Sequence, residues 1–313
     1  MYIYTFLHEK AKKDISFLLN SNLRHIFASS NKHNITMATT IAFLNYKGGV
    51  GKSTSTVNVA KALHDLGKRV LVIDADSQGN ASKMMGKKLT DNSNETLYEV
   101  MSRGLDIRQC ICVDQDREDS FDYVPSNQNL VYAEMELVSR ISRESILRKA
   151  LAPVQEHYDY ILIDCTPTDG LISQNAIAAS DYIIVPLNGE TFALDGMGKI
   201  LQRYREVKDG INPNLQILGY MFTLMRKCGL HDNTRESLIK LHESNHWPGE
   251  IFKTEIKQNV CFAESASYFT NIFDYAETFD GKKIQDRSKR ESALKAAAQY
   301  RELAEEIINK LNR

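Results

Sequence analysis

The sequence predicts an α/β fold in which a mostly parallel, twisted sheet carries helices on both faces. Short apolar runs recur with the length and composition of buried parallel strands, at residues 41–44, 70–73, 160–163 and 182–185. Stretches with apolar residues at helical spacing separate these runs, and strands that alternate with helices form parallel sheets. The first run ends in a glycine-rich loop and two others end in aspartates, so the carboxyl edge of the sheet is the expected ligand site.

The glycine-rich loop joins the first expected strand to a helix expected over residues 54–66. Its residues are Lys47, Gly48, Gly49, Val50, Gly51, Lys52, Ser53 and Thr54. Glycines let the backbone turn tightly, so that N–H groups converge on phosphate oxygens at the helix N-terminus. The pattern is an altered G-x-x-x-x-G-K-[ST] loop, because Asn45, Tyr46 and Lys47 fill the stretch where the first glycine belongs. Lys47 is useful only if a second molecule presents phosphates to it. The alternative is a glycine turn without a ligand.

Aspartates follow two of the later strands. Asp76 comes after the strand at residues 70–74, and Asp164 closes the strand that begins at residue 160. An acid at such a strand end has the form of a Walker B residue, which holds the Mg²⁺ shell through water. Taken alone, each aspartate is explained as a strand cap. Beside a phosphate loop, the pair favours a magnesium–phosphate site.

The rest of the chain continues the alternation of strands and helices. Further strands are expected at residues 182–186, 217–224 and 250–254. Further helices are expected near residues 134–150, 171–179, 194–208 and 232–243. A last helix is expected over residues 292–311, and it should pack on the core through Leu294, Ala297, Tyr300, Ala304, Ile307 and Leu311.

Composition narrows the class of protein. A chain of 313 residues is long enough for one large α/β domain. Its formal net charge of −1 excludes a protein that coats nucleic acid by bulk charge, so DNA contact would need a local basic patch. Five cysteines without a disulfide framework indicate a reducing cytoplasm. No apolar stretch approaches the length of a membrane span, so no stable membrane association is expected.

The loop and the two aspartates resemble the deviant Walker ATPases of the P-loop NTPase type, and within them the ParA/Soj partition proteins. Lys47 is the most specific residue, since it matches the family's signature lysine. The resemblance covers residues 40–279 and 297–310. It also includes segments at residues 123–127, 133–137, 185–187, 192–196, 256–260, 263–264 and 300–303.

The resemblance implies a role for each matching residue. Lys52 would bind the β- and γ-phosphates of ATP in its own subunit, and Lys47 would reach across a dimer interface to the partner's nucleotide. Ser53 would ligate Mg²⁺, Asp76 would position the attacking water, and Asp164 would be the Walker B acid. The implied catalytic residues are Lys47, Lys52 and Asp76. The implied magnesium site is Ser53, Asp76 and Asp164. The nucleotide site would combine residues 47–54 with Met225, Ile256, Lys257 and Asn259.

The implied function is a slow, partner-stimulated ATPase for plasmid or chromosome segregation, with ATP and Mg²⁺ as ligands. Such a protein forms an ATP-sandwich homodimer, binds nonspecific DNA on the nucleoid, and is switched by a ParB-like centromere-binding protein. The alternative is a MinD-like or other ParA-like positioning ATPase that acts on membrane or a protein cargo. Retention on DNA that depends on ATP and falls with salt separates the two.

Three residues depart from the family pattern. Thr166 replaces the first of two prolines after the Walker B acid, so the stiffness of that loop should differ. Tyr46 replaces the more usual glutamine before the signature lysine. Cys261 stands where many relatives carry an arginine for nonspecific DNA contact, which weakens the case for DNA binding through that patch.

Two segments lie outside the family pattern. Residues 1–36 form an N-terminal extension before the single domain at 37–313, and either synthesis starts at Met37 or the extension is an accessory amphipathic helix. A basic insertion lies near residues 280–295. It is either a solvated loop that runs into a helix or a replacement for the arginine missing at position 261.

Overall fold

A computed structural model describes residues 37–86, 95–112, 120–189, 196–279, 282–283 and 286–312. The N-terminal extension expected at residues 1–36 lies outside the described residues, and so does most of the family segment at 192–196. Side chains of the basic insertion are described from Asp286 onward. Residues 38–313 form one compact unit, which carries all the elements below.

Seven parallel strands form the central sheet, in the order β3-β2-β4-β1-β5-β6-β7. They are β1 (Thr39–Phe43), β2 (Val70–Ala75), β3 (Asp122–Val124), β4 (Tyr160–Cys165), β5 (Tyr182–Asn188), β6 (Gln216–Thr223) and β7 (Glu250–Ile251). A separate antiparallel pair joins β8 (Thr278–Phe279) to β9 (Lys282–Lys283). The expected parallel α/β fold is confirmed, although β3 at the sheet edge was not recognised as a strand.

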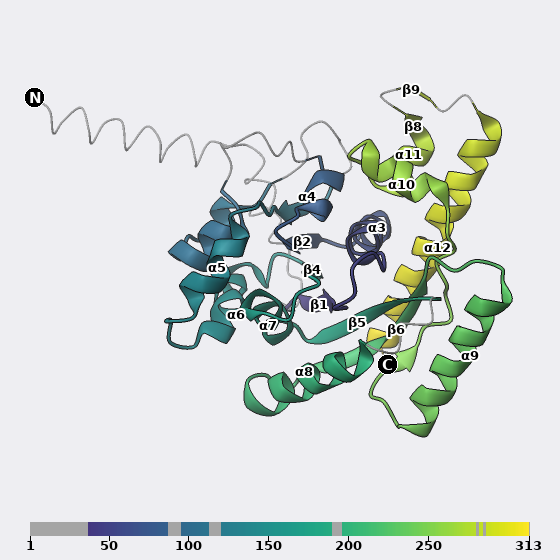
Figure 1. Ribbon diagram of the computed structural model, residues 1–313. Helices are drawn as coiled ribbons and strands as arrows, with labels where there is room; N and C mark the ends of the chain where they lie inside the picture. The colour runs from purple at the N-terminus through teal and green to yellow at the C-terminus, as the bar shows by residue number, and fades with distance from the viewer. Residues whose placement is uncertain are drawn as a thin grey trace, which may run out of the picture. The chain divides into compact units, whose positions relative to one another are not determined.

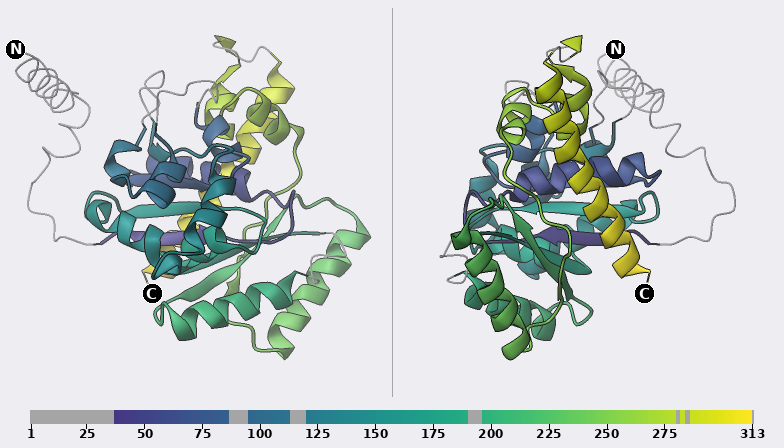
Figure 2. Two further views of the ribbon diagram at one scale, coloured as in Figure 1. Left: turned by 60° about the vertical axis from the view of Figure 1, so that its left-hand side comes forward. Right: turned by 90° about the vertical axis from the view of Figure 1, so that its right-hand side faces the viewer.

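Helices cover both faces of the sheet (Figures 1 and 2). One face carries α3 (Lys52–Asp65), α4 (Asn80–Met84), α10 (Val260–Ser267), α11 (Ile272–Glu277) and α12 (Arg287–Leu311), the long yellow helix of Figure 1. The other face carries α5 (Leu130–Leu137), α6 (Ile146–Leu151), α7 (Leu171–Ala178), α8 (Met197–Gly210) and α9 (Gly229–Ser244). Short helical turns lie at Glu99–Arg103, Ile107–Gln109, Arg143–Ser145 and Ala152–Val154.

Alternating side chains divide the core into two layers. Ile41 and Phe43 of β1 pack towards α3 and α12, whereas Ala42 and Leu44 pack towards α5–α8. Successive strand residues point to opposite faces, so a strand covered on both sides must be apolar at every position. This explains why buried strands could be recognised as continuous apolar runs.

Two expected elements have different bounds. The helix expected near 134–150 is interrupted, since α5 ends at Leu137 and α6 begins at Ile146. Ser142 has a left-handed φ of 53°, and the Asn175 side chain binds the carbonyl of Arg143 and the amide of Leu147. The strand expected at 250–254 ends at Ile251. The Phe252 amide still donates to the Tyr220 carbonyl of β6 at 2.9 Å, but the amides of Lys253 and Thr254 donate to the Glu306 carboxylate rather than to a strand.

The last helix also differs from its prediction. It begins at Arg287 rather than near residue 292, because the Asp286 side chain caps it by accepting from the Lys289 amide at 3.2 Å. Leu294 was expected on the core face, but 46% of it is exposed. It lies six residues before the buried Tyr300, which places it about 120° around the helix from the core side.

Candidate functional site

The loop between β1 and α3 is built as a phosphate cradle. Gly49 and Gly51 have left-handed φ values of 75° and 79°, which side chains with a Cβ adopt only under strain. Helix α3 begins at Lys52, and no side chain among the described residues caps it. The first amides of the helix therefore remain available to an anion at its positive end.

The two lysines of the loop have different neighbours. The Lys52 ammonium is buried and donates to the carbonyl of Lys47 at 3.0 Å. Burial lowers the pKa of Lys52, while the charge of Asp164 opposes that change. The Lys47 ammonium instead lies 3.5 Å from Asn188 Oδ1 at the carboxyl end of β5. Lys52 therefore lies inside the phosphate cradle, whereas Lys47 lies at its margin.

Asp164 lies at the centre of the carboxyl edge, paired in register with Asp74 of β2 and Phe43 of β1. Its carboxylate is fully buried, and neither oxygen closes a hydrogen bond of normal geometry with a described residue. Burial first, and then the charge of Asp74, raises the pKa of Asp164 well above its usual value; the nearby Ser53 hydroxyl acts in the opposite direction. A buried charge is costly unless a donor or cation pairs with it, so this carboxylate fits a hydrated Mg²⁺.

The residues around Asp164 suit a magnesium site with few protein ligands. Ser53, the second residue of α3, is half-buried beside the cradle. Within the described ranges, no group of three or more His, Cys, Asp or Glu side chains is placed to hold a metal. Mg²⁺ is commonly held by one or two carboxylates together with water and substrate phosphate. The donor set at Ser53 and Asp164 is of this kind.

Asp74 and Asp76 are both buried at the end of β2, but they have different partners. Asp74 accepts from the Ser82 amide at 2.7 Å and from its hydroxyl at 2.6 Å, which anchors the start of α4. Burial raises the pKa of Asp74 to about 6. Asp76 accepts only from the Gln78 amide, at 3.0 Å through Oδ1, among the contacts of the described residues. Asp76 therefore keeps an oxygen for another ligand.

The four residues expected at the adenine base come from two segments that are distant in the sequence and meet in the fold. Met225 pairs with Lys257 in a parallel bridge, and its amide donates to the carbonyl of Ile256 at 3.0 Å. Asn259 caps α10 by accepting from the Cys261 amide at 2.9 Å. Met225 and Ile256 are buried, whereas Lys257 is exposed. Contact with adenine stays a prediction.

Sequence reasoning missed polar residues that brace the cradle from neighbouring strands. The Thr223 hydroxyl, at the end of β6, donates to the carbonyl of Val50 at 2.8 Å. Asn45 accepts from the Lys47 amide at 2.9 Å and donates to the carbonyl of Pro186 at 2.7 Å. Thr223 and Asn188 are the last residues of β6 and β5, and Asp164 lies one residue before the end of β4, so a search for polar residues at strand ends would have found them.

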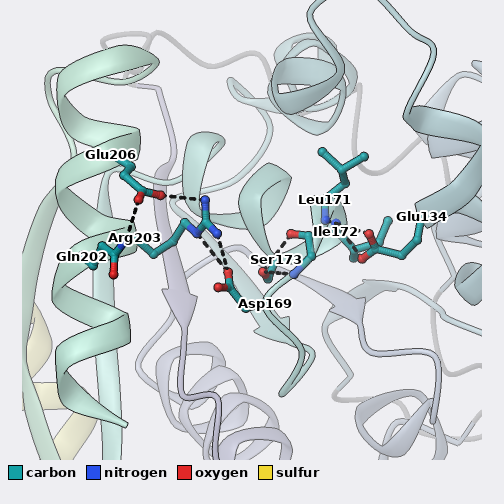
Figure 3. A network of polar contacts seen from close by, with 9 residues as sticks. Glu134, Asp169, Leu171, Ile172, Ser173, Gln202, Arg203 and Glu206 are labelled. Carbon is teal, nitrogen blue, oxygen red and sulfur yellow. Dashed lines mark hydrogen bonds and ion pairs between the residues drawn. The ribbon is translucent and has the colours of Figure 1, made fainter.

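The loop after Asp164 is held from both sides (Figure 3). Glu134 of α5 accepts from the amides of Leu171 and Ile172 at 2.7 and 3.0 Å, which caps α7. On the other side, Arg203 of α8 binds Asp169 at 2.9 Å. Thr166, which stands in place of a proline, has its hydroxyl 3.0 Å from that of Thr168. Side chains, rather than a second proline, thus order this loop.

Comparison with known proteins identifies the family. Residues 38–217 match the family described as an AAA domain. The sporulation initiation inhibitor protein Soj of Bacillus subtilis is 35% identical over 249 residues, which cover 79% of this chain and 95% of the relative. The chain belongs to the ParA/Soj family of partition ATPases. The chromosome partitioning protein ParA of Myxococcus xanthus is 34% identical over 240 residues, covering 77% of this ParA/Soj chain and 82% of that protein.

Solved structures agree with the fold of this ParA/Soj chain. Cobyrinic acid a,c-diamide synthase from Mycobacterium smegmatis, with bound ADP and magnesium, superposes with a TM-score of 0.71 at 26% identity. The match covers 88% of this chain and 96% of that chain. The Cyanothece McdA(D38A)–ATP complex superposes with a TM-score of 0.71 at 19% identity, over 88% and 97% of the two chains, and supports the fold alone.

Proposed function

We infer that this chain is a slow, partner-stimulated ATPase that drives DNA partition with ATP and Mg²⁺ as its ligands. The observation that supports the inference is the fully buried carboxylate of Asp164, which closes no hydrogen bond of normal geometry with a described residue and lies beside the Ser53 hydroxyl at the start of α3. A buried carboxylate and the positive N-terminus of a helix lie at one edge of the sheet, and a magnesium–nucleotide pair is complementary to both. The relatives with partition names support the biological role.

The chain's own residues divide the work of phosphoryl transfer. Lys52 and the first amides of α3 hold the phosphates, and their positive charge stabilises the charge that spreads over the transferred group. When bound at Ser53 and Asp164, Mg²⁺ would neutralise phosphate oxygens. Asp76 orients the attacking water through Oδ2, since Oδ1 already accepts from the Gln78 amide. Little covalent chemistry is required of the protein, so positioning sets the rate.

Lys47 gives the proposed dimer its dependence on ATP. Its ammonium lies near Asn188 at the rim of the cradle, so a rotation of its long side chain carries the charge outward. In a twofold dimer, this ammonium reaches the triphosphate of the partner subunit. Two nucleotides then join two chains, and hydrolysis releases them. The proposal includes a ParB-like protein that speeds this release.

DNA binding is assigned to exposed cations on α12. Cys261 is buried, so it offers no DNA contact. Lys289 is held inward, because its ammonium pairs with Glu264 at 3.0 Å. Arg290 and Lys295 are exposed, and Lys295 lines a groove of about 520 Å³ together with Lys257, Gln258 and Gln299. Amide and ammonium donors of this kind suit phosphate contacts without base specificity.

The test of the function is ATPase activity of the full chain with and without nonspecific DNA and a candidate ParB-like protein. We expect slow hydrolysis alone and synergistic stimulation by the two together. Binding to liposomes that depends on ATP, with no retention on DNA, would favour a positioning ATPase instead. No helix in the described part of the chain combines the length and apolar character needed to span a bilayer.

The DNA surface makes a separate prediction. Arg290→Glu with Lys295→Glu should abolish DNA retention with ATP while basal hydrolysis stays within about twofold, because neither residue lies at the cradle. Removing one of the two cations should lower the slope of log affinity against log salt by about one. Lys199→Glu with Arg205→Glu, an exposed pair on α8, makes the same charge change as a control. Equal DNA binding by the two double variants would refute the assignment.

A further inference from the structure

Leu224 has a left-handed backbone at the point where the chain leaves β6. Its φ is 54°, a conformation that a bulky side chain adopts only under strain. The residue before it, Thr223, braces the cradle by donating to the carbonyl of Val50. The residue after it, Met225, is the first one expected at the adenine base. A strained residue therefore joins the segment that supports the phosphate cradle to the segment expected to contact the base.

Hydrogen bonds from two other segments hold the turn beyond Leu224. The Met225 amide donates to the carbonyl of Ile256 at 3.0 Å, and the Met225 carbonyl accepts from the Gln258 amide at 2.8 Å. The next amide, of Arg226, donates instead to a side chain, Nδ1 of His231, at 3.1 Å. A strained backbone persists only where its surroundings hold it in place, and His231 supplies the side-chain part of that support.

His231 is buried in the first turn of α9, with 8% of it exposed. Because its Nδ1 accepts from an amide, that nitrogen carries no proton. The ring also lies directly over Gly189, where a Cβ would overlap it, so position 189 has no room for a side chain. Gly189 follows Asn188, the residue next to the Lys47 ammonium. The imidazole therefore contacts both the end of β5 and the turn after β6.

We propose that His231 is a positioning residue for the nucleotide. Its Nδ1 holds Arg226 and so fixes Met225, the preceding residue, at the place expected for the base. His231 acts through the backbone of this turn rather than by contact with the phosphates, so it contributes to the affinity for the nucleoside part of ATP. This consequence rests on the proposed ATPase function, whereas the hold on the turn does not.

Amide hydrogen exchange of the full chain without nucleotide tests the hold on the turn. His231→Leu keeps a side chain of similar size and removes the acceptor, so exchange at Met225 and Arg226 should speed up by about threefold to tenfold. His231→Asn places an amide oxygen close to the position of Nδ1, so it should restore much of the protection. If His231→Leu does not fold, His231→Gln takes its place, since its oxygen falls closer to the position of Nε2.

The matched control is His242→Leu. His242 is also a histidine of α9, and its Nε2 lies 2.9 Å from a backbone carbonyl, that of Gly249. It lies about three turns further along the helix, so its loss should leave exchange at Met225 and Arg226 unchanged.

Calorimetric titration with Mg-ATP and with magnesium tripolyphosphate tests the consequence for the nucleotide. His231→Leu should weaken the binding of ATP by about threefold to tenfold and leave that of tripolyphosphate within about twofold, because only ATP carries a base. In steady-state kinetics, the same variant should raise KM for ATP while kcat stays within about twofold, as expected when ground-state and transition-state binding are lost together.

Unchanged exchange at Arg226 in His231→Leu, or an equal change in His242→Leu, would overturn the role of His231. Equal losses of affinity for ATP and tripolyphosphate would also overturn it, because the ring would then act on the phosphate cradle. A wild-type chain that neither bound nor hydrolysed ATP would overturn the proposed function, and the exchange measurements would still decide whether His231 holds the turn.

Discussion

At the scale of single residues, Asp164 is the position at which the requirements of stability and of ligand binding differ most. A carboxylate that is fully buried beside Asp74, and that closes no hydrogen bond of normal geometry with a described residue, destabilises the folded chain unless a cation pairs with it. Such strain is typical of sites whose ligand supplies the missing partner. Asp74 and Asp76 differ in the same respect. Ser82 donates two hydrogen bonds to Asp74, whereas Oδ2 of Asp76 accepts none from the described residues.

Asp164→Asn should therefore stabilise the protein without nucleotide and remove its response to Mg-ATP. An amide avoids the burial of charge, so we expect the free energy of unfolding at pH 7 to rise by about 1–3 kcal/mol. The gain should grow with pH, because the raised pKa of Asp164 means that the wild type loses stability as pH rises through that pKa. Thermal unfolding with and without Mg-ATP measures both effects.

Asp122→Asn is the control, since Asp122 is a half-buried carboxylate that also has a raised pKa but is bound by Tyr158 at the far edge of the sheet. It should leave the thermal shift caused by Mg-ATP unchanged. If Asp164→Asn destabilised the chain without nucleotide, or kept the full shift with Mg-ATP, Asp164 would not be the metal-shell acid.

At the scale of elements, three helices meet at Glu264. This residue lies on α10, accepts from the Tyr275 hydroxyl of α11 at 2.6 Å, and pairs with Lys289 of α12 at 3.0 Å. The hydrogen bond from Tyr275, and then Lys289, lowers the pKa of Glu264. These contacts hold α10, α11 and α12 together and so orient Arg290 and Lys295, the exposed cations of the proposed DNA surface.

The lowered pKa of Glu264 gives a pH-dependent prediction. Its contribution to stability is present above the ordinary glutamate value of 4.5 and is lost as the pH falls below it. Glu264→Gln should therefore lower the Tm at pH 7 by about 2–4 °C, and the difference from the wild type should shrink as the pH falls below 4.5 and through the lowered pKa of Glu264. Thermal unfolding at a series of pH values checks this. A difference that stayed constant down to pH 3.5 would contradict the assigned ion pair.

The helices and strands also show which parts of the fold could be predicted from the sequence. Strands β1, β2, β4 and β5 were predicted because burial on both faces makes them apolar throughout. The end of β7 depends on Glu306, and the break between α5 and α6 depends on Asn175. Both partners are distant in the chain, so local periodicity carries no sign of them.

The residues of the candidate site likewise form a group that the sequence could predict and a group that it could not. The loop at residues 47–54 is local, so its turn and its place at the start of α3 followed from glycine spacing and from family resemblance. Thr223 and Arg203 instead contact the cradle and the loop after Asp164 from distant segments of the chain. Local patterns in the sequence therefore give no sign of these contacts.

At the scale of the whole molecule, the proposed function requires two chains. In the proposed dimer, Lys52 and Asp76 serve the nucleotide of their own subunit, whereas Lys47 serves the partner's. A ParA/Soj chain with this division would have incomplete sites as a monomer, and ATP would complete them by joining two subunits. Symmetry makes the two sites equivalent, so each needs residues from both chains.

Mixing two inactive variants tests this division most directly. Lys47→Ala and Asp76→Ala should each lack ATPase activity alone. In a mixed dimer, the Lys47→Ala subunit keeps its own Asp76 and receives Lys47 from its partner, so one of the two sites is complete. An equal mixture should recover about a quarter of wild-type activity, since half of the dimers are mixed and each has one working site. Recovery of that size is the predicted result, and a mixture as inactive as its components would contradict the account.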